Sequence, residues 1–105
     1  MSFSLPPSLV EAKLRRLSLD QLRALLFLCG RTGAVSSLVV GEKIGLKGKS
    51  LGGIFSSLSR QKIRRQPLVL PHGREEGKRN LRWRFNEAII SPKQAKALIK
   101  KILQF

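Results

Sequence analysis

Hydrophobic residues recur at intervals of three and four along five segments of the chain, which is the spacing of one face of an α-helix. In the second segment, Ser18 and Gln21 have the spacing of a capping box, and Gly30 is expected to end the helix with a positive φ. Ser8 and Glu11 have the same capping spacing in the first segment. The predicted helices cover residues 8–17, 18–29, 36–44, 49–60 and 91–103, with Ser36 or Ser37 as the cap of the third and Pro92 at the first position of the last.

The period of the pattern changes between the fourth and fifth helices. Pro67–Pro71 is a short apolar run bounded by prolines, which predicts an edge strand. Leu81–Phe85 alternates strictly, with Leu81, Trp83 and Phe85 on one face and two arginines on the other, which predicts a half-buried strand. Residues 72–80 between these strands are polar and contain two glycines, so we expect a loop that completes a β-hairpin.

The length of 105 residues and the apolar fraction of 42% fit one small domain and exclude a two-domain enzyme with a deep cleft. We expect residues 1–7 to be disordered and residues 8–90 to form the domain. Residues 91–105 are expected to form a C-terminal helix whose stripe, from Ala95 to Leu103, packs on the domain or on a second subunit, which would make a homodimer.

The longest apolar run, residues 25–29, is far shorter than a membrane span, and the N-terminus has no basic and apolar leader. The single cysteine, Cys29, fits a reducing compartment. These observations predict a cytoplasmic protein that does not associate with membranes.

The charge of the chain is strongly one-sided. Twenty-one Lys and Arg oppose six Asp and Glu, which gives a net charge of +15. Residues 43–84 contain twelve of the basic residues and only Glu75 and Glu76 as acidic ones, a local net charge of +10. Such an uneven distribution favours a nucleic acid as the partner over a merely solvated surface.

The order of these elements resembles the winged helix-turn-helix superfamily of DNA-binding domains. Val35–Leu46 resembles the positioning helix and turn, Lys47–Ile63 resembles the recognition helix, and Leu81–Phe85 is similar to the second strand of the wing. The resemblance implies an α+β fold with a three-helix core and a β-hairpin wing, here with additional N-terminal and C-terminal helices. It further implies a small prokaryotic-type regulator or a chromatin-like protein that binds duplex DNA at the nucleoid.

The residues expected to contact nucleic acid lie in the recognition-like helix, the hairpin and the segment between them. Lys47 stands where the superfamily commonly has a Ser or Thr cap, so this position departs from the pattern. The expected contact residues are Lys47, Lys49, Ser50, Gly53, Ser57, Arg60, Lys62, Arg64, Arg65, Arg74, Lys78, Arg79, Arg82 and Arg84.

The paired glycines Gly52 and Gly53 are a second departure, because the superfamily usually carries polar side chains there. They either let the helix backbone approach DNA closely or let the helix pack tightly against another helix. A helix with so few long polar side chains offers few base-reading groups, so we expect low sequence specificity.

None of the sequence motifs typical of enzymes or metal sites is complete in this chain. Gly48-Lys49-Ser50 ends like a phosphate-binding loop, but Lys43 stands where the first glycine of that motif is required. One His and one Cys are too few for the usual metal site, and Cys29 lies on an apolar stripe. We therefore expect no catalytic residue, no metal and no cofactor. RNA binding, and service as a protein-interaction module in a larger complex, are the alternatives to duplex DNA binding.

Overall fold

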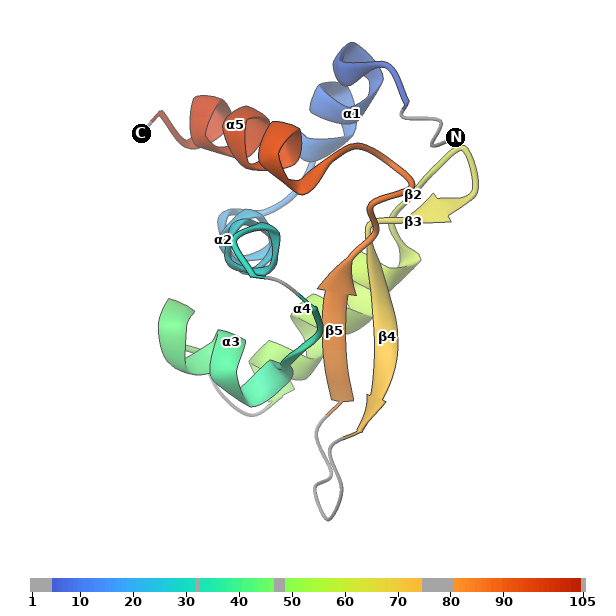
Figure 1. Ribbon diagram of the computed structural model, residues 1–105. Coiled ribbons are helices and arrows are strands. Elements are labelled where there is room, and N and C mark those ends of the chain that lie inside the picture. The colour runs from blue at the N-terminus through green and yellow to red at the C-terminus, as the bar shows by residue number, and fades with distance from the viewer. Residues whose placement is uncertain (1–4, 32, 47–48, 75–80, 105) are drawn as a thin grey trace.

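The computed structural model describes residues 5–31, 33–46, 49–74 and 81–104, without the side chains of Lys49 and Ser50. In these ranges the protein is an α+β fold of five helices and five short strands (Figure 1). The helices are α1 (Pro7–Leu14), α2 (Leu19–Cys29), α3 (Ser37–Ile44), α4 (Lys49–Arg60) and α5 (Pro92–Leu103). The strands are β1 (Val35–Ser36), β2 (Lys62–Ile63), β3 (Gln66–Pro67), β4 (Val69–Arg74) and β5 (Leu81–Phe85).

The predicted starts of α2, α3 and α5 are confirmed by their caps. The Ser18 hydroxyl accepts from the Gln21 N–H, and the Gln21 side chain accepts from the Ser18 N–H, so the capping box is complete. Ser36 caps α3 and Ser91 caps α5 in the same extended backbone conformation. Side-chain oxygens thus satisfy amide groups that the first turn of a helix leaves without partners.

The predicted end of α2 at Cys29, with Gly30 as its C-cap, is confirmed, but the φ of Gly30 is −86° and not positive. The first predicted helix, residues 8–17, is wrong at both ends, because α1 spans Pro7–Leu14. Ser8 does not cap α1, which begins one residue earlier at Pro7 with Pro6 as its N-cap. The expected disorder of residues 1–7 is also wrong from residue 5 on, since the Leu5 N–H donates to the Ile89 carbonyl at 2.7 Å.

Strand β5 is the centre of a three-stranded antiparallel sheet in the order β1-β5-β4. Strand β1 was not predicted from the sequence; Val35 pairs with Trp83 and adds a strand to the predicted hairpin. Strand β4 runs to Arg74, so the prediction that the loop begins at His72 is wrong for residues 72–74. Pro71 is tolerated because β4 is an edge strand, and Gly73 takes a φ of +73° where the pairing is irregular.

A second, two-stranded hairpin between α4 and β4 was not predicted. Its strands, β2 and β3, pair Lys62 with Pro67 and Ile63 with Gln66. The two turn residues, Arg64 and Arg65, have φ values of +49° and +73°. Such turns are normally built from Asn-Gly or similar pairs, so an Arg-Arg turn gives no recognisable signal in the sequence.

The apolar faces of the helices and the sheet meet in one core. The rings of Phe55 in α4 and Trp83 in β5 stack with centroids 5.4 Å apart and an interplanar angle of 13°. Trp83 is only 8% exposed, so the prediction that it is a core residue is confirmed. Helix α5 lies across α2 and α1, and its Ala95 and Ile99 are fully buried by the same chain (Figure 1).

Gly41 of α3 lies against Leu46 in the turn after α3 and against Leu51 of α4. A Cβ atom at this position would lie 2.5 Å from the Leu46 carbonyl oxygen and 2.6 Å from a methyl group of Leu51. Gly41 is buried, so these neighbours have little room to move. The close packing of the turn between α3 and α4 therefore requires a glycine at position 41.

We expect Gly41→Ala to lower the free energy of unfolding by about 1–3 kcal/mol, because overpacking a close contact forces the backbone to shift. The matched control is Gly52→Ala in α4, where a Cβ would meet nothing within 4 Å. This control should raise stability by up to about 1 kcal/mol through helix propensity alone. Urea unfolding of both variants measures the difference, and a Gly41→Ala protein as stable as the parent would contradict the close contact.

Candidate nucleic-acid interface

Helix α4 has one buried face and one open face. Leu51, Phe55 and Leu58 are buried, whereas Gly52 and Gly53 are exposed. A Cβ atom built on either glycine would have no neighbour within 4 Å among the described residues. The hypothesis that the paired glycines serve helix packing is therefore wrong, and the backbone of α4 is accessible along this face.

The sequence pattern predicted that Ser57 lies on the open face of α4, and this prediction is wrong. Ser57 is half-buried, and its hydroxyl accepts a hydrogen bond from Gln21 Nε2 at 2.7 Å. The sequence placed Ser57 by its position on the helix alone and could not show that the first turn of α2 lies beside it. Ser57 joins α4 to α2 and marks the boundary of the open face.

The basic residues that follow α4 are exposed. Arg60 closes the helix, and its Nε donates to the Ser56 carbonyl at 3.2 Å. Lys62, Arg64 and Arg65 lie on the β2–β3 hairpin beyond the C-terminal end of α4. Figure 1 places this hairpin near α1, at the end of the molecule opposite to the free end of the β4–β5 hairpin.

The arginines of the β4–β5 hairpin divide into two groups. Arg74 is exposed at the end of β4. Arg82 and Arg84 lie on the face of β5 opposite to Trp83, and hence away from α4, because side chains alternate along a strand. Arg82 is half-buried: Nη2 donates to the His72 carbonyl at 3.1 Å, while its buried Nε has no partner among the described residues.

The remaining predicted contact residues cannot be placed as side chains. Lys47, Lys78 and Arg79 lie outside the described residues. Lys49 and Ser50 belong by their backbone to the first turn of α4. The structure thus places Gly53 and Arg60 on α4, Lys62, Arg64 and Arg65 on the hairpin that follows its C-terminal end, and Arg82 and Arg84 on the outer face of the sheet.

The ion pairs between described residues do not involve α4 or the β4–β5 hairpin. The three ion pairs between described residues join Arg15 and Lys101 to Glu11, and Arg23 to Asp20, on or next to α1, α2 and α5. Hydrogen bonds from Lys101 and Arg15 hold the pKa of the Glu11 carboxyl below its ordinary value. No residue of α4 is acidic, so its field remains positive.

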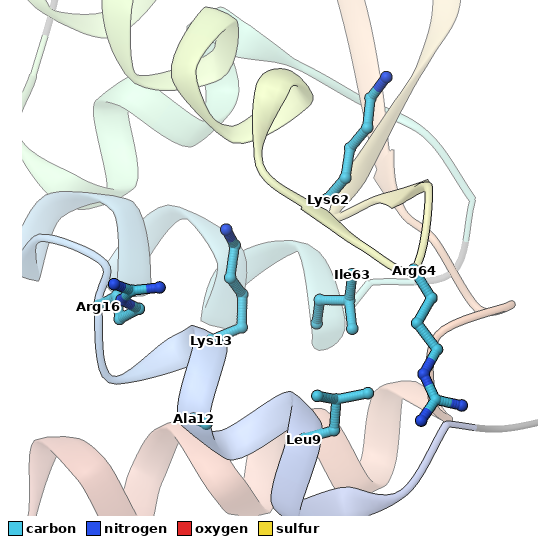
Figure 2. A pocket seen from close by; sticks show the side chains of 7 residues that line it. All are labelled: Leu9, Ala12, Lys13, Arg16, Lys62, Ile63 and Arg64. Atoms are coloured by element: carbon cyan, nitrogen blue, oxygen red, sulfur yellow. The ribbon is translucent and has the colours of Figure 1, made fainter.

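Four basic residues that are distant in the sequence meet at a pocket between α1 and the β2–β3 hairpin. Lys13 and Arg16 come from α1 and the turn after it, and Lys62 and Arg64 come from the hairpin (Figure 2). Sequence reasoning missed Lys13 and Arg16, because about fifty residues separate them from their neighbours and the hairpin was not predicted. No local motif could have indicated this juxtaposition.

Groups capable of nucleophilic or metal chemistry are poorly placed in the part of the chain that the structure describes. Cys29 is buried, and the loss of hydration raises the pKa of its thiol to about 12. His72 is exposed on β4. Within the described ranges, no three His, Cys, Asp or Glu side chains are grouped so that they could hold a metal ion.

Comparison of the chain with protein-family models, curated proteins and solved structures found no match. Among the helices in the described ranges, none combines the length and the hydropathy that crossing a bilayer requires. Inference about function therefore starts from the open face of α4, the surrounding charge and the pocket.

We expect Cys29 to be almost inert toward a thiol reagent in the folded protein. With a pKa of about 12, its thiolate is a negligible fraction of the thiol at pH 8, and the side chain is also buried. Labelling with a chromogenic disulfide at pH 8 should be at least about a hundredfold slower than in guanidinium chloride. Rapid stoichiometric labelling of the folded protein would show that this thiol is accessible.

Proposed function

We propose that the chain is a winged helix-turn-helix protein that binds duplex DNA with low sequence specificity. In this proposal α2, α3 and α4 form the three-helix core, α4 is the recognition helix, and the β4–β5 hairpin is the wing. The element order supports the assignment, since two helices joined by a tight turn precede the hairpin. Strand β1 pairs with β5 at Arg82 and Trp83 and so ties this strand to the start of α3.

The observation that carries the proposal is the open glycine face of α4. Each glycine inside a helix costs about 1 kcal/mol relative to alanine, and neither Gly52 nor Gly53 offsets this cost by packing. At positions where its exposed face carries no side chain, a helix can bring its backbone close to another surface. The major groove of B-DNA, about 12 Å wide, admits an α-helix.

The charge around this face suits a polyanion. Arg60 and Arg74 are exposed basic residues on α4 and the wing, and α4 has no carboxylate to repel phosphate. Contacts to phosphates position a protein on DNA without reading its sequence. We assign Arg64 and Arg65 to neither element, because they lie beyond the C-terminal end of α4. The same chemistry would place the protein at the nucleoid, as a regulator or a chromatin-type protein.

Binding to duplex DNA should depend steeply on salt. Each neutralised phosphate adds about 0.9 to the slope of log K against log salt concentration, so about six contacts give a slope near −5. Fluorescence anisotropy with two duplexes of unrelated sequence should give slopes and affinities that agree within a few-fold. A flat salt dependence would contradict the proposal, and tighter binding to structured RNA of equal length would favour the RNA alternative.

Gly53→Glu should separate binding from folding. The glutamate side chain would stand between α4 and the groove and repel phosphate, so we expect DNA affinity to fall at least about tenfold, within the 1–3 kcal/mol typical of a lost contact. The melting temperature should stay equal or rise, since glutamate is the better helix former and a Cβ meets no neighbour.

The matched control is Ala97→Glu, which makes the same change in net charge at an exposed position of α5. This variant should bind duplex DNA within about twofold of the parent, because a single remote charge is screened at 0.15 M salt. Gly53→Ala, which adds no charge, should lose less affinity than Gly53→Glu. If Gly53→Glu bound as well as Ala97→Glu, α4 would not face the DNA.

A further inference from the structure

The pocket between α1 and the β2–β3 hairpin combines an apolar floor with a basic rim. It has a volume of about 280 Å³. Leu9 and Ile63 form the floor, and Figure 2 shows their side chains facing each other across the junction of the two elements. The two elements that line it, α1 and the β2–β3 hairpin, lie in Figure 1 at the end of the molecule opposite to the far ends of β4 and β5.

The cations stand on two sides of this floor. In Figure 2 the Arg64 guanidinium group lies on one side of Leu9. Lys13 and Arg16 lie on the opposite side, and the Lys62 amino group points away from the floor. A ligand that spans the floor can therefore reach charge at either end. The pocket therefore has charged side chains at its rim and apolar side chains at its floor.

These cations have no carboxylate beside them among the described residues that line the pocket. The one acidic residue of α1, Glu11, is engaged by Arg15 and Lys101. The rim of the pocket therefore carries cations without a neutralising carboxylate among its described lining residues, which favours an anionic ligand.

The turn that carries Arg64 is strained. Arg64 and Arg65 both occupy the left-handed region, with φ values of +49° and +73°, which is unfavourable for a residue that has a Cβ atom. Glycine or asparagine would satisfy the turn better. Backbone strain of this kind concentrates where a side chain serves a ligand, and Arg64 is the turn residue that lines the pocket.

We propose that this pocket binds a nucleotide, with the phosphate held by Arg64 and the base lying on Leu9 and Ile63. A guanidinium group matches phosphate oxygens with two parallel hydrogen bonds, and flat bases lie well on apolar side chains. The volume is near the lower end of small-molecule sites, which suits one nucleotide better than an extended chain. A bare phosphate would leave the apolar floor unused.

A nucleotide can come from solution or from the unpaired end of a nucleic-acid strand, and both have the chemistry that the pocket recognises. The proposal does not depend on duplex binding by α4. Its test therefore keeps the two sites apart by measuring small ligands and a blunt duplex separately.

Isothermal titration with adenosine 5′-monophosphate, adenosine and inorganic phosphate is the first measurement. We expect the monophosphate to bind at least tenfold more tightly than either fragment, because only it uses both the rim and the floor. Equal affinity for the monophosphate and inorganic phosphate would overturn the proposal, since it would show a charge effect without a base site.

Arg64→Gly and Arg65→Gly form a matched pair of variants. Both remove one positive charge and relieve one strained φ, so both should melt at or above the temperature of the parent. Only Arg64 lines the pocket. Arg64→Gly should weaken binding of the monophosphate at least tenfold and Arg65→Gly less than twofold; equal losses, or no loss in Arg64→Gly, would overturn the proposal.

A duplex with a three-nucleotide single-stranded overhang, compared with the blunt duplex, identifies the source of the nucleotide. If a strand end occupies the pocket, Arg64→Gly should lower affinity for the overhang duplex and leave blunt-duplex affinity unchanged. If free nucleotide is the ligand, both duplexes should bind Arg64→Gly equally while monophosphate binding is lost. Failure of blunt-duplex binding in the parent would count against the function of α4 and not against the pocket.

Discussion

The stack of Phe55 on Trp83 fixes the relation between the helices and the sheet. Trp83 belongs to the central strand β5, which pairs with β1 on one side and β4 on the other. Phe55 lies on the buried face of α4, so this contact determines which side of α4 turns outward. The exposure of Gly52 and Gly53 is the direct consequence, because a helix that buries Leu51, Phe55 and Leu58 must turn the glycines away.

Asn86 connects the three-stranded sheet to the β2–β3 hairpin that lines the pocket. It is the one buried polar residue in the described part of the core, and its Nδ2 donates to the Pro67 carbonyl at 2.9 Å and to Gln66 Oε1 at 3.2 Å. Its N–H donates to the Leu68 carbonyl and its Oδ1 accepts from the Ala88 N–H. The end of β5 thereby holds β3, so a satisfied buried amide positions the turn that carries Arg64.

The sequence predicted the elements whose signals are local and missed those that depend on distant partners. Caps at Ser18 and Ser91 and the alternation of Leu81–Phe85 are properties of a few neighbouring residues, and the structure confirms them. Strand β1 is only two residues long and exists because β5 offers a pairing edge.

The same division applies to the candidate sites. The open face of α4 follows from the helical period, apart from Ser57, whose partner Gln21 is 36 residues away. The pocket could not be predicted, because an Arg-Arg turn is not a typical hairpin sequence and α1 approaches it only in the folded chain. Charge indicated a polyanionic partner, but only the fold divides the basic residues into separate surfaces.

Glycines inside helices and non-glycine residues with positive φ lower stability at three places in this fold, and the contacts that compensate for the cost differ between them. Gly41 weakens α3 but permits the close contact of α3 with Leu46 and Leu51, so packing accounts for it. Gly52 and Gly53 weaken α4, and Arg64 and Arg65 strain a turn, without a comparable packing gain in the described structure. In a small domain with a total stability on the order of 5–15 kcal/mol, costs of about 1 kcal/mol each are a substantial fraction. A role toward a ligand gives Gly53 and Arg64 a physical reason that stability alone does not.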